Sequence, residues 1–143
     1  MKFAYSKYTV VPSPAAPERT VLFRPVIPVR FLGPSAARNV YALRDTGADE
    51  SYITESMAEK LGVTPLSAGS SIIQSASGEM SVVYGRITVE IADEDDHFSF
   101  PITVGIVGED WSEAILGHVG FLEHFDATFS YAEKLVTLTP RSS

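Results

Sequence analysis

The sequence contains no cysteine, so neither a disulfide framework nor a thiolate metal site can contribute to its stability or chemistry. Its three histidines, His97, His118 and His124, lack the spacing of metal ligands, and we expect no metal and no cofactor. Basic residues are also few, since 11 Lys and Arg stand against 18 Asp and Glu, for a formal net charge of −7. An acidic chain with scattered basic residues repels phosphate backbones, so nucleic-acid binding is not expected.

Long apolar runs are missing as well. The first eight residues interleave polar groups where a secretory signal needs an unbroken apolar stretch, and no later run approaches the length of a membrane span. We therefore expect a soluble cytoplasmic protein without a membrane partner. The 143 residues, 45% of them apolar, suit one compact domain with a single core.

Prolines divide the chain near residue 20. Pro12, Pro14 and Pro17 follow one another closely, and none can donate a hydrogen bond to a sheet. Residues 1–20 are therefore predicted to form an N-terminal arm or linker, and residues 21–143 the folded domain. An edge strand at residues 7–11 is the alternative for part of this arm.

The remaining pattern predicts a mostly β protein, because short runs rich in Val, Ile, Thr, Tyr and Phe alternate with glycine and proline. A run of four acidic residues at 93–96 is typical of a solvated turn. Strands are expected at residues 26–31, 40–43, 71–74, 80–84, 86–92, 98–107, 114–117, 127–130 and 135–138.

Two short helices are expected among these strands. The first is predicted at Glu55–Leu61, where Thr54 can cap the first turn and Gly62 can end the last. The second is predicted over residues 118–124.

The residues with catalytic potential follow the strand predicted at 40–43. Asp45 supplies a carboxylate, Thr46 a hydroxyl that can fix a turn, and Gly47 a backbone that can approach other groups closely. These residue types are common in ordinary turns, so an Asp that only caps backbone donors is the alternative. Peptide hydrolysis by carboxylates needs two of them sharing one proton, and a single Asp cannot supply both.

The segments around this motif occur in the order of a known family. Ala48 and Asp49 follow it, then the helix ending before Gly62, a glycine-tipped hairpin through residues 76–79, and the apolar segment 114–117. Over residues 24–139 the chain resembles the retropepsins, the single-domain aspartic proteases of retroviruses, retroelements and bacteria.

The resemblance implies a closed, mostly β, retropepsin-like barrel of the acid protease fold, with one or two short helices. It also implies a homodimer, because the chain has one Asp-Thr-Gly and the second carboxylate must come from another copy. Each subunit would contribute a flap that closes over a bound peptide. The resemblance assigns catalysis to Asp45, the active-site loop to Thr46 and Gly47, and substrate binding to Ala48, Asp49, Ala76, Ser77 and Gly78.

The predicted function is therefore that of an aspartic endopeptidase acting on a peptide or protein substrate. Water activated by the paired Asp45 carboxylates would hydrolyse the peptide bond. The alternative is a catalytically weak or inactive retropepsin-like module that dimerises or binds peptides. For Asp49 and Glu50, substrate binding and a simple exposed helix-start acid both remain open.

Two residues depart from the family pattern. Arg44 precedes Asp45 where relatives carry an apolar residue. A cation there can pair with the carboxylate, whereas strand alternation places Arg44 on the opposite face. His118 stands where the viral enzymes carry Arg, so that any contact with Asp49 would be weaker and dependent on pH. Trp111 is expected to anchor a loop.

Overall fold

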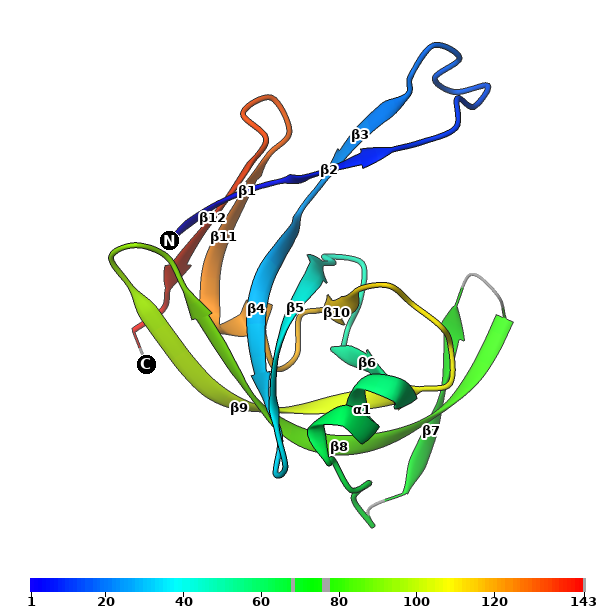
Figure 1. Cartoon of the computed structure of the whole chain (residues 1–143), viewed down its shortest axis with the longest axis vertical. Helices are drawn as coiled ribbons and strands as arrows, with labels where there is room; N and C mark the ends of the chain where they lie inside the picture. Colours follow the sequence, from blue (N-terminus) through cyan, green and yellow to red (C-terminus); the bar gives the residue numbers. More distant parts are fainter. Residues whose placement is uncertain (68, 76–77, 143) are drawn as a thin grey trace.

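The computed structural model describes residues 1–67, 69–75 and 78–142. Three β-sheets make up most of these residues (Figure 1). The largest sheet contains β4 (Val26–Leu32), β5 (Ala37–Arg44), β6 (Tyr52–Thr54), β7 (Ser70–Ser75), β8 (Gly78–Ala92), β9 (His97–Val107) and β10 (Ala114–Leu116). Its strand order is β4-β5-β10-β6-β9-β8-β7, and β4 also pairs with β8. The sheet therefore bends back on itself, and the mostly β prediction is confirmed.

The two ends of the chain share the second sheet. It contains β1 (Lys2–Ala4), β11 (Phe125–Ser130) and β12 (Leu135–Pro140), in the order β1-β12-β11. The ammonium group of Met1 donates a hydrogen bond to the Leu138 carbonyl at 2.8 Å, and Phe3 is only 8% exposed. The start of the chain is therefore part of the folded body, while the domain boundary expected at residue 20 stays a prediction.

The third sheet is a two-stranded ribbon of β2 (Ser6–Thr9) and β3 (Val21–Arg24). It extends beyond the other strands in Figure 1, and the loop containing the closely spaced prolines joins its two strands. The alternative prediction of a strand within the arm is thus confirmed for residues 7–9. The hydroxyl of Tyr8 donates to Glu113 Oε1 at 2.8 Å, which ties the ribbon to the loop before β10.

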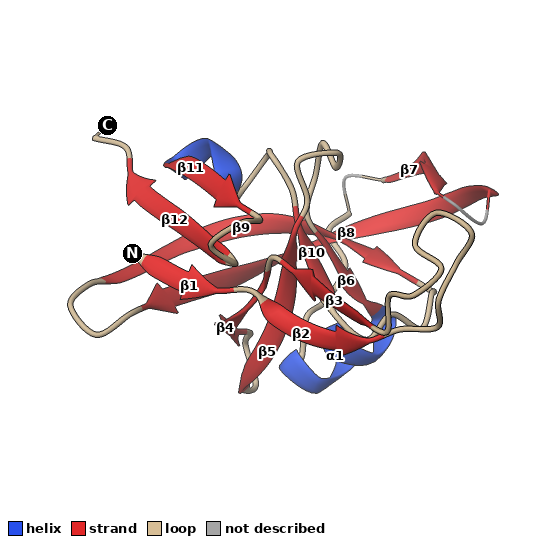
Figure 2. Cartoon of the chain, turned by 90° about the horizontal axis from the view of Figure 1, so that it is seen from above, coloured by secondary structure: helices blue, strands red, loops and turns tan. Residues whose placement is uncertain are grey.

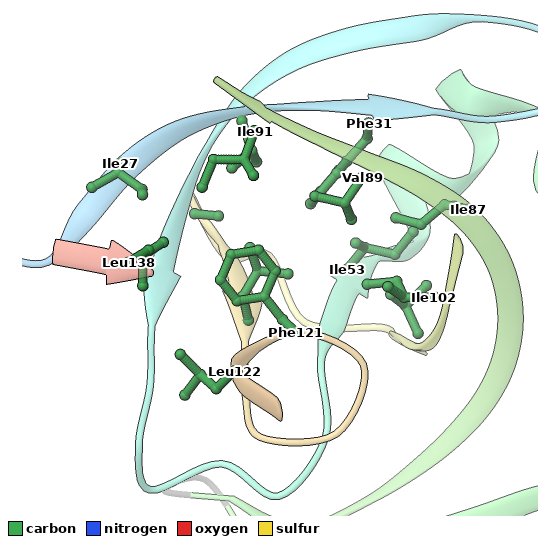
Figure 3. Packing of buried hydrophobic residues seen from close by; sticks show 14 of the residues in the cluster. Ile27, Phe31, Ile53, Ile87, Val89, Ile91, Ile102, Phe121, Leu122 and Leu138 are labelled. Carbon is green, nitrogen blue, oxygen red and sulfur yellow. The ribbon is translucent and has the colours of Figure 1, made fainter. Parts of the chain in front are cut away.

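Alternating side chains of the long strands fill the core. In β8, Ile87, Val89 and Ile91 are at most 3% exposed, because every second residue of a strand points to the same face. Figure 3 shows the ring of Phe121 at the centre of this cluster, which is formed with side chains from β4, β6, β9 and β12. The labelled members include Ile27, Phe31, Ile53, Ile102, Leu122 and Leu138.

The helix α1 (Glu55–Leu61) has the predicted bounds and both predicted caps. The Thr54 hydroxyl accepts a hydrogen bond from the Met57 amide at 3.2 Å. Gly62 has a φ of 74°, the left-handed conformation that ends helices and suits glycine. Figure 2 shows α1 and the second helical element, η1 (Leu122–His124), at opposite sides of the molecule.

Two predicted strands and one predicted helix differ from the structure. The strands expected at 80–84 and 86–92 are one continuous strand, β8. A Cβ at Gly85 would lie 2.4 Å from Val63 Cγ1, so this glycine makes room for a neighbour and does not mark a turn. The helix expected over 118–124 is reduced to η1, a single 3-10 turn, because Gly120 with a φ of 87° leaves the helical conformation.

Candidate active site

The turn that carries Asp45 begins where two parallel strands end side by side. β5 pairs with β10 through Ala42–Ala114 and Leu43–Ile115, and the pairing ends at Arg44 and Leu116. The next amide, that of Asp45, donates to the Leu116 carbonyl at 3.1 Å. The last hydrogen bond of the strand pair therefore fixes the backbone from which the Asp45 side chain leaves.

The Asp45 carboxylate is held by its own turn. Its Oδ1 accepts a hydrogen bond from the Gly47 amide at 2.8 Å, and the Ala48 amide donates to the Asp45 carbonyl at 3.2 Å. A Cβ at position 47 would lie 3.2 Å from Asp45 Oδ1, closer than an ordinary contact. Glycine thus permits the approach that orients the carboxylate.

The segment after β10 supports this turn from behind. The Gly117 amide donates to Ser51 Oγ at 3.1 Å, and Ser51 Oγ donates to the Val119 carbonyl at 3.2 Å. A Cβ at Gly117 would lie 2.2 Å from the Glu50 carbonyl oxygen, a separation that real side chains do not adopt. Residue 117 must therefore be glycine if the segment is to lie this close to the turn.

His118 adds a side-chain contact to this support. Its amide donates to the Ala48 carbonyl at 3.0 Å, and its ring Nε2 lies 2.8 Å from the carbonyl oxygen of Thr46. Because a carbonyl oxygen only accepts, Nε2 carries the proton in this contact. The ring thus reaches Thr46, whereas the sequence had suggested the Asp49 carboxylate as its partner.

Arg44 points away from Asp45, as strand alternation predicts. It is 2% exposed, its guanidinium lies 4.5 Å from the centre of the Phe121 ring, and its Nη1 donates to the Ala42 carbonyl at 2.9 Å. Burial lowers the pKa of Arg44 well below its ordinary value. Within the described part of the chain, its Nε and Nη2 have no hydrogen-bond partner, and it forms no ion pair with Asp45.

A cavity of about 840 Å³ opens beside Asp45. The turn contributes Asp45, Gly47, Ala48 and Asp49 to its lining. The other lining residues, Tyr52, Ile72, Ile73, Gln74, Glu109, Trp111 and Ile115, come from β6, β7, β10 and the loop before β10. The lining therefore combines three acidic residues, Asp45, Asp49 and Glu109, with apolar side chains such as Ile72 and Trp111. A concave site with both polar groups and apolar surface suits an organic ligand.

The structure brings together only some of the predicted site residues. Asp45, Gly47, Ala48 and Asp49 line the cavity, whereas Thr46 is exposed outside this lining and Gly78 lies at the start of β8. The predictions for residues 76 and 77 (Ala76 and Ser77) fall outside the described residues.

Sequence reasoning missed most of the cavity wall. Ile72 is 70% exposed although it is apolar, and Trp111 stands edge-on to Tyr52 with ring centres 6.4 Å apart. Trp111 therefore contacts Tyr52 of β6 and also lines the cavity, beyond the anchoring role expected for it. A signal existed in the sequence for β7, since Ile72 and Ile73 are consecutive and a half-buried strand can bury only one of them.

Among residues 1–67, 69–75 and 78–142, no three His, Asp or Glu side chains are arranged to hold a metal ion. In the same residues, no helix combines the length and apolar composition that a membrane crossing requires.

Comparison with known proteins agrees with this geometry. A family model described as "gag-polyprotein putative aspartyl protease" matches residues 36–124, more than half of the chain. No curated protein sequence matches the chain. Among solved structures, a retropepsin-like aspartic protease from Rickettsia conorii is 18% identical, with a TM-score of 0.53 over 79% of this chain and 81% of that one.

Two further structures show weaker likeness. The EIAV protease in complex with the inhibitor HBY-793 is 21% identical, with a TM-score of 0.46 over 66% of this chain and 82% of that chain. The retroviral protease-like domain of Ddi1 from Leishmania major is 19% identical, with a TM-score of 0.48, and the alignment covers 79% of this chain and 87% of that chain. With the family model and the Rickettsia fold in agreement, the chain belongs to the gag-polyprotein aspartyl protease family and has a retropepsin-like fold.

Proposed function

We propose that the protein is an aspartic endopeptidase that hydrolyses peptide bonds with water activated by two Asp45 carboxylates, one from each copy of a homodimer. The observation that carries this proposal is the position of Asp45, whose carboxylate is oriented by the Gly47 amide at the edge of a cavity with apolar side chains in its wall. Family membership supports the reaction class.

The reaction divides the work between the two carboxyl groups. Two carboxylates about 3 Å apart cannot both ionise readily, so the pair holds one proton. The ionised carboxylate removes a proton from water, and the protonated one donates a hydrogen bond to the scissile carbonyl. Water then adds to the carbonyl carbon, and the tetrahedral intermediate collapses when the leaving nitrogen takes up a proton, which breaks the C–N bond.

The second carboxylate has to come from a second copy. Thr46 and Gly47 are exposed in the single chain, as residues at a contact between two copies must be before assembly. In the proposed dimer Thr46 braces the two active-site loops, and the isologous contact places the two Asp45 side chains at the twofold axis. The closed barrel expected for the subunit is part of the same proposal.

The cavity walls support a peptide as the substrate. Ile72, Ile73, Trp111 and Ile115 present apolar surface next to Asp45, which suits an extended peptide with apolar side chains flanking the cut. Ala48 and Asp49 would contact the peptide backbone from the turn. The paired strands β7 and β8 would contribute the flap, for which the sequence predicted Ala76, Ser77 and Gly78.

The other prediction was a peptide-binding module without turnover, and it rested on the cation that precedes Asp45 in the sequence. Arg44 is buried on the opposite face of β5, against the ring of Phe121. That alternative therefore has no specific observation in its favour.

Cleavage of a mixed peptide library from acidic to neutral pH tests the proposal. The wild-type protein should cut peptides between apolar residues, and Asp45→Asn should abolish cutting. Asp126→Asn is the matched control, because its carboxylate is 81% exposed on β11 and lies 3.8 Å from Nε of the exposed Arg141. Equal cutting by Asp45→Asn and the wild type would exclude Asp45 as the catalytic group.

A further inference from the structure

A chain of hydrogen bonds leads from the end of the active-site turn to the strand that lines the cavity. Glu50 Oε2 accepts hydrogen bonds from the Tyr84 hydroxyl at 2.8 Å and from the Tyr52 hydroxyl at 3.4 Å. The Tyr84 oxygen also lies 2.5 Å from Ser71 Oγ. Because the single phenolic proton of Tyr84 is directed to Glu50, Ser71 donates to Tyr84.

The sheet register explains why the two tyrosines meet at one carboxylate. Tyr52 on β6 and Tyr84 on β8 are both paired with Gly105 on β9, the strand between them. A Cβ at Gly105 would lie 2.6 Å from Tyr52 Cδ1, so the glycine leaves the space that the Tyr52 ring occupies. The phenol groups therefore converge on Glu50, five residues after Asp45.

Both phenols remain hydrogen-bond donors at physiological pH. Burial, followed by the charge of Glu50, raises the pKa of Tyr52 to about 12. Burial also raises the pKa of Tyr84. Tyr52 is only 9% exposed. In such a partly dry environment water competes little for the donors and acceptors, so the hydrogen bonds between them are stronger than in water.

The strand at the other end of this chain forms part of the cavity. Ser71 lies in β7 immediately before Ile72, Ile73 and Gln74, which line the cavity together with Asp45. β7 is the last strand of its sheet and is paired only with β8 in the described residues. A strand with one neighbour opens more readily than an inner strand, so a side-chain link to the active-site turn has a measurable effect on it.

We propose that Glu50, acting through Tyr84 and Ser71, positions β7 at the Asp45 cavity and so sets how tightly the protein binds an extended peptide. Glu50, Tyr84 and Ser71 are positioning residues, since none of them is required to touch the reacting atoms. The effect on peptide binding rests on the proposed function, whereas the effect on β7 in the free protein does not.

Hydrogen exchange in the free protein tests the positioning of β7. In Tyr84→Phe, amides at residues 70–74 should exchange about tenfold faster, while those of β9 stay unchanged, because a hydrogen bond to a charged acceptor is lost at one point only. Glu50→Gln keeps an acceptor oxygen and should show a smaller increase than Glu50→Leu. Tyr131→Phe, which removes a hydroxyl in the turn between β11 and β12, should leave β7 unchanged.

Peptide kinetics test the consequence for binding. Tyr84→Phe should raise KM about fivefold with kcat within about twofold of the wild type, because β7 orders the binding wall and not the carboxylates. Unchanged exchange of β7 in both Tyr84→Phe and Glu50→Leu would overturn the positioning role. Faster exchange with an unchanged KM would overturn its effect on binding. Faster exchange in a protein that cuts no peptide would retain the positioning role and overturn the proposed function.

Discussion

Replacing Arg44 with methionine should stabilise the protein. The guanidinium is almost fully buried, and its Nε and Nη2 have no hydrogen-bond partner among the described residues. Burial lowers its pKa, so at any pH below the lowered value the folded state carries the charge at a cost that the unfolded chain does not bear. Methionine fills a similar length without a charge and without N–H groups.

The size of the gain is the cost of the unpartnered nitrogens minus the contribution of the contacts that the substitution removes. The two buried nitrogens without a partner, Nε and Nη2, cost about 1–3 kcal/mol each, and methionine removes both. Against this, the hydrogen bond from Nη1 to Ala42 and the contact with the Phe121 ring contribute about 0.5–1.5 kcal/mol and about 0.5–2 kcal/mol. Arg44→Met should therefore raise the free energy of unfolding by about 1–3 kcal/mol.

Urea unfolding at several protein concentrations measures this gain, because the concentration series separates unfolding from any dissociation of copies. Arg30→Met is the matched control: Arg30 has a side chain 54% exposed and a Glu90 partner at 3.8 Å, so its loss should change stability by about 0.5 kcal/mol or less. Destabilisation by Arg44→Met beyond about 1 kcal/mol would refute the reasoning and indicate a partner for the guanidinium. Arg44→Met should leave the pH profile of peptide cleavage unchanged, because Arg44 points away from Asp45.

Two further substitutions test the N-terminal segment and the ribbon. Phe3→Ala should lower the free energy of unfolding by about 3 kcal/mol, because Phe3 is buried in the core. An unchanged urea midpoint would instead support the prediction that residues 1–20 are a dispensable arm. Hydrogen bonds from Ser112 and Tyr8 lower the pKa of Glu113 from 4.5, so its stabilising effect is present above that value and is lost as pH falls through the lower folded-state pKa. Glu113→Gln should flatten the fall in stability between about pH 6 and about pH 3, and a profile identical to that of the wild type would contradict this.

Local chemistry made several elements predictable from the sequence. Thr54 and Gly62 mark the ends of α1, because a side-chain cap and a left-handed glycine are properties of a few adjacent residues. Strand alternation likewise placed Arg44 and Asp45 on opposite faces. The Asp45 turn could be proposed because its hydrogen bond to Gly47 spans two residues.

Features that depend on distant residues could not be predicted in this way. Gly85 suggested a break in a strand, but its role is to make room for Val63, which is visible only in the folded chain. Phe3 belongs to the core because β1 pairs with β12 from the other end of the chain. The cavity wall at Ile72 and Trp111 depends on how β7 and the loop before β10 come together around Asp45.

Mixing of subunits tests the central claim most directly. Wild-type protein at a fixed, low concentration is equilibrated with increasing amounts of Asp45→Asn protein, and peptide cleavage is measured. If each active site needs one Asp45 from each of two copies, an about tenfold excess of the variant should reduce cleavage to about a tenth, because nearly every wild-type chain then pairs with an inactive one. The same excess of Asp126→Asn protein should not inhibit. Cleavage that stays constant as Asp45→Asn is added would contradict a catalytic site shared between two copies.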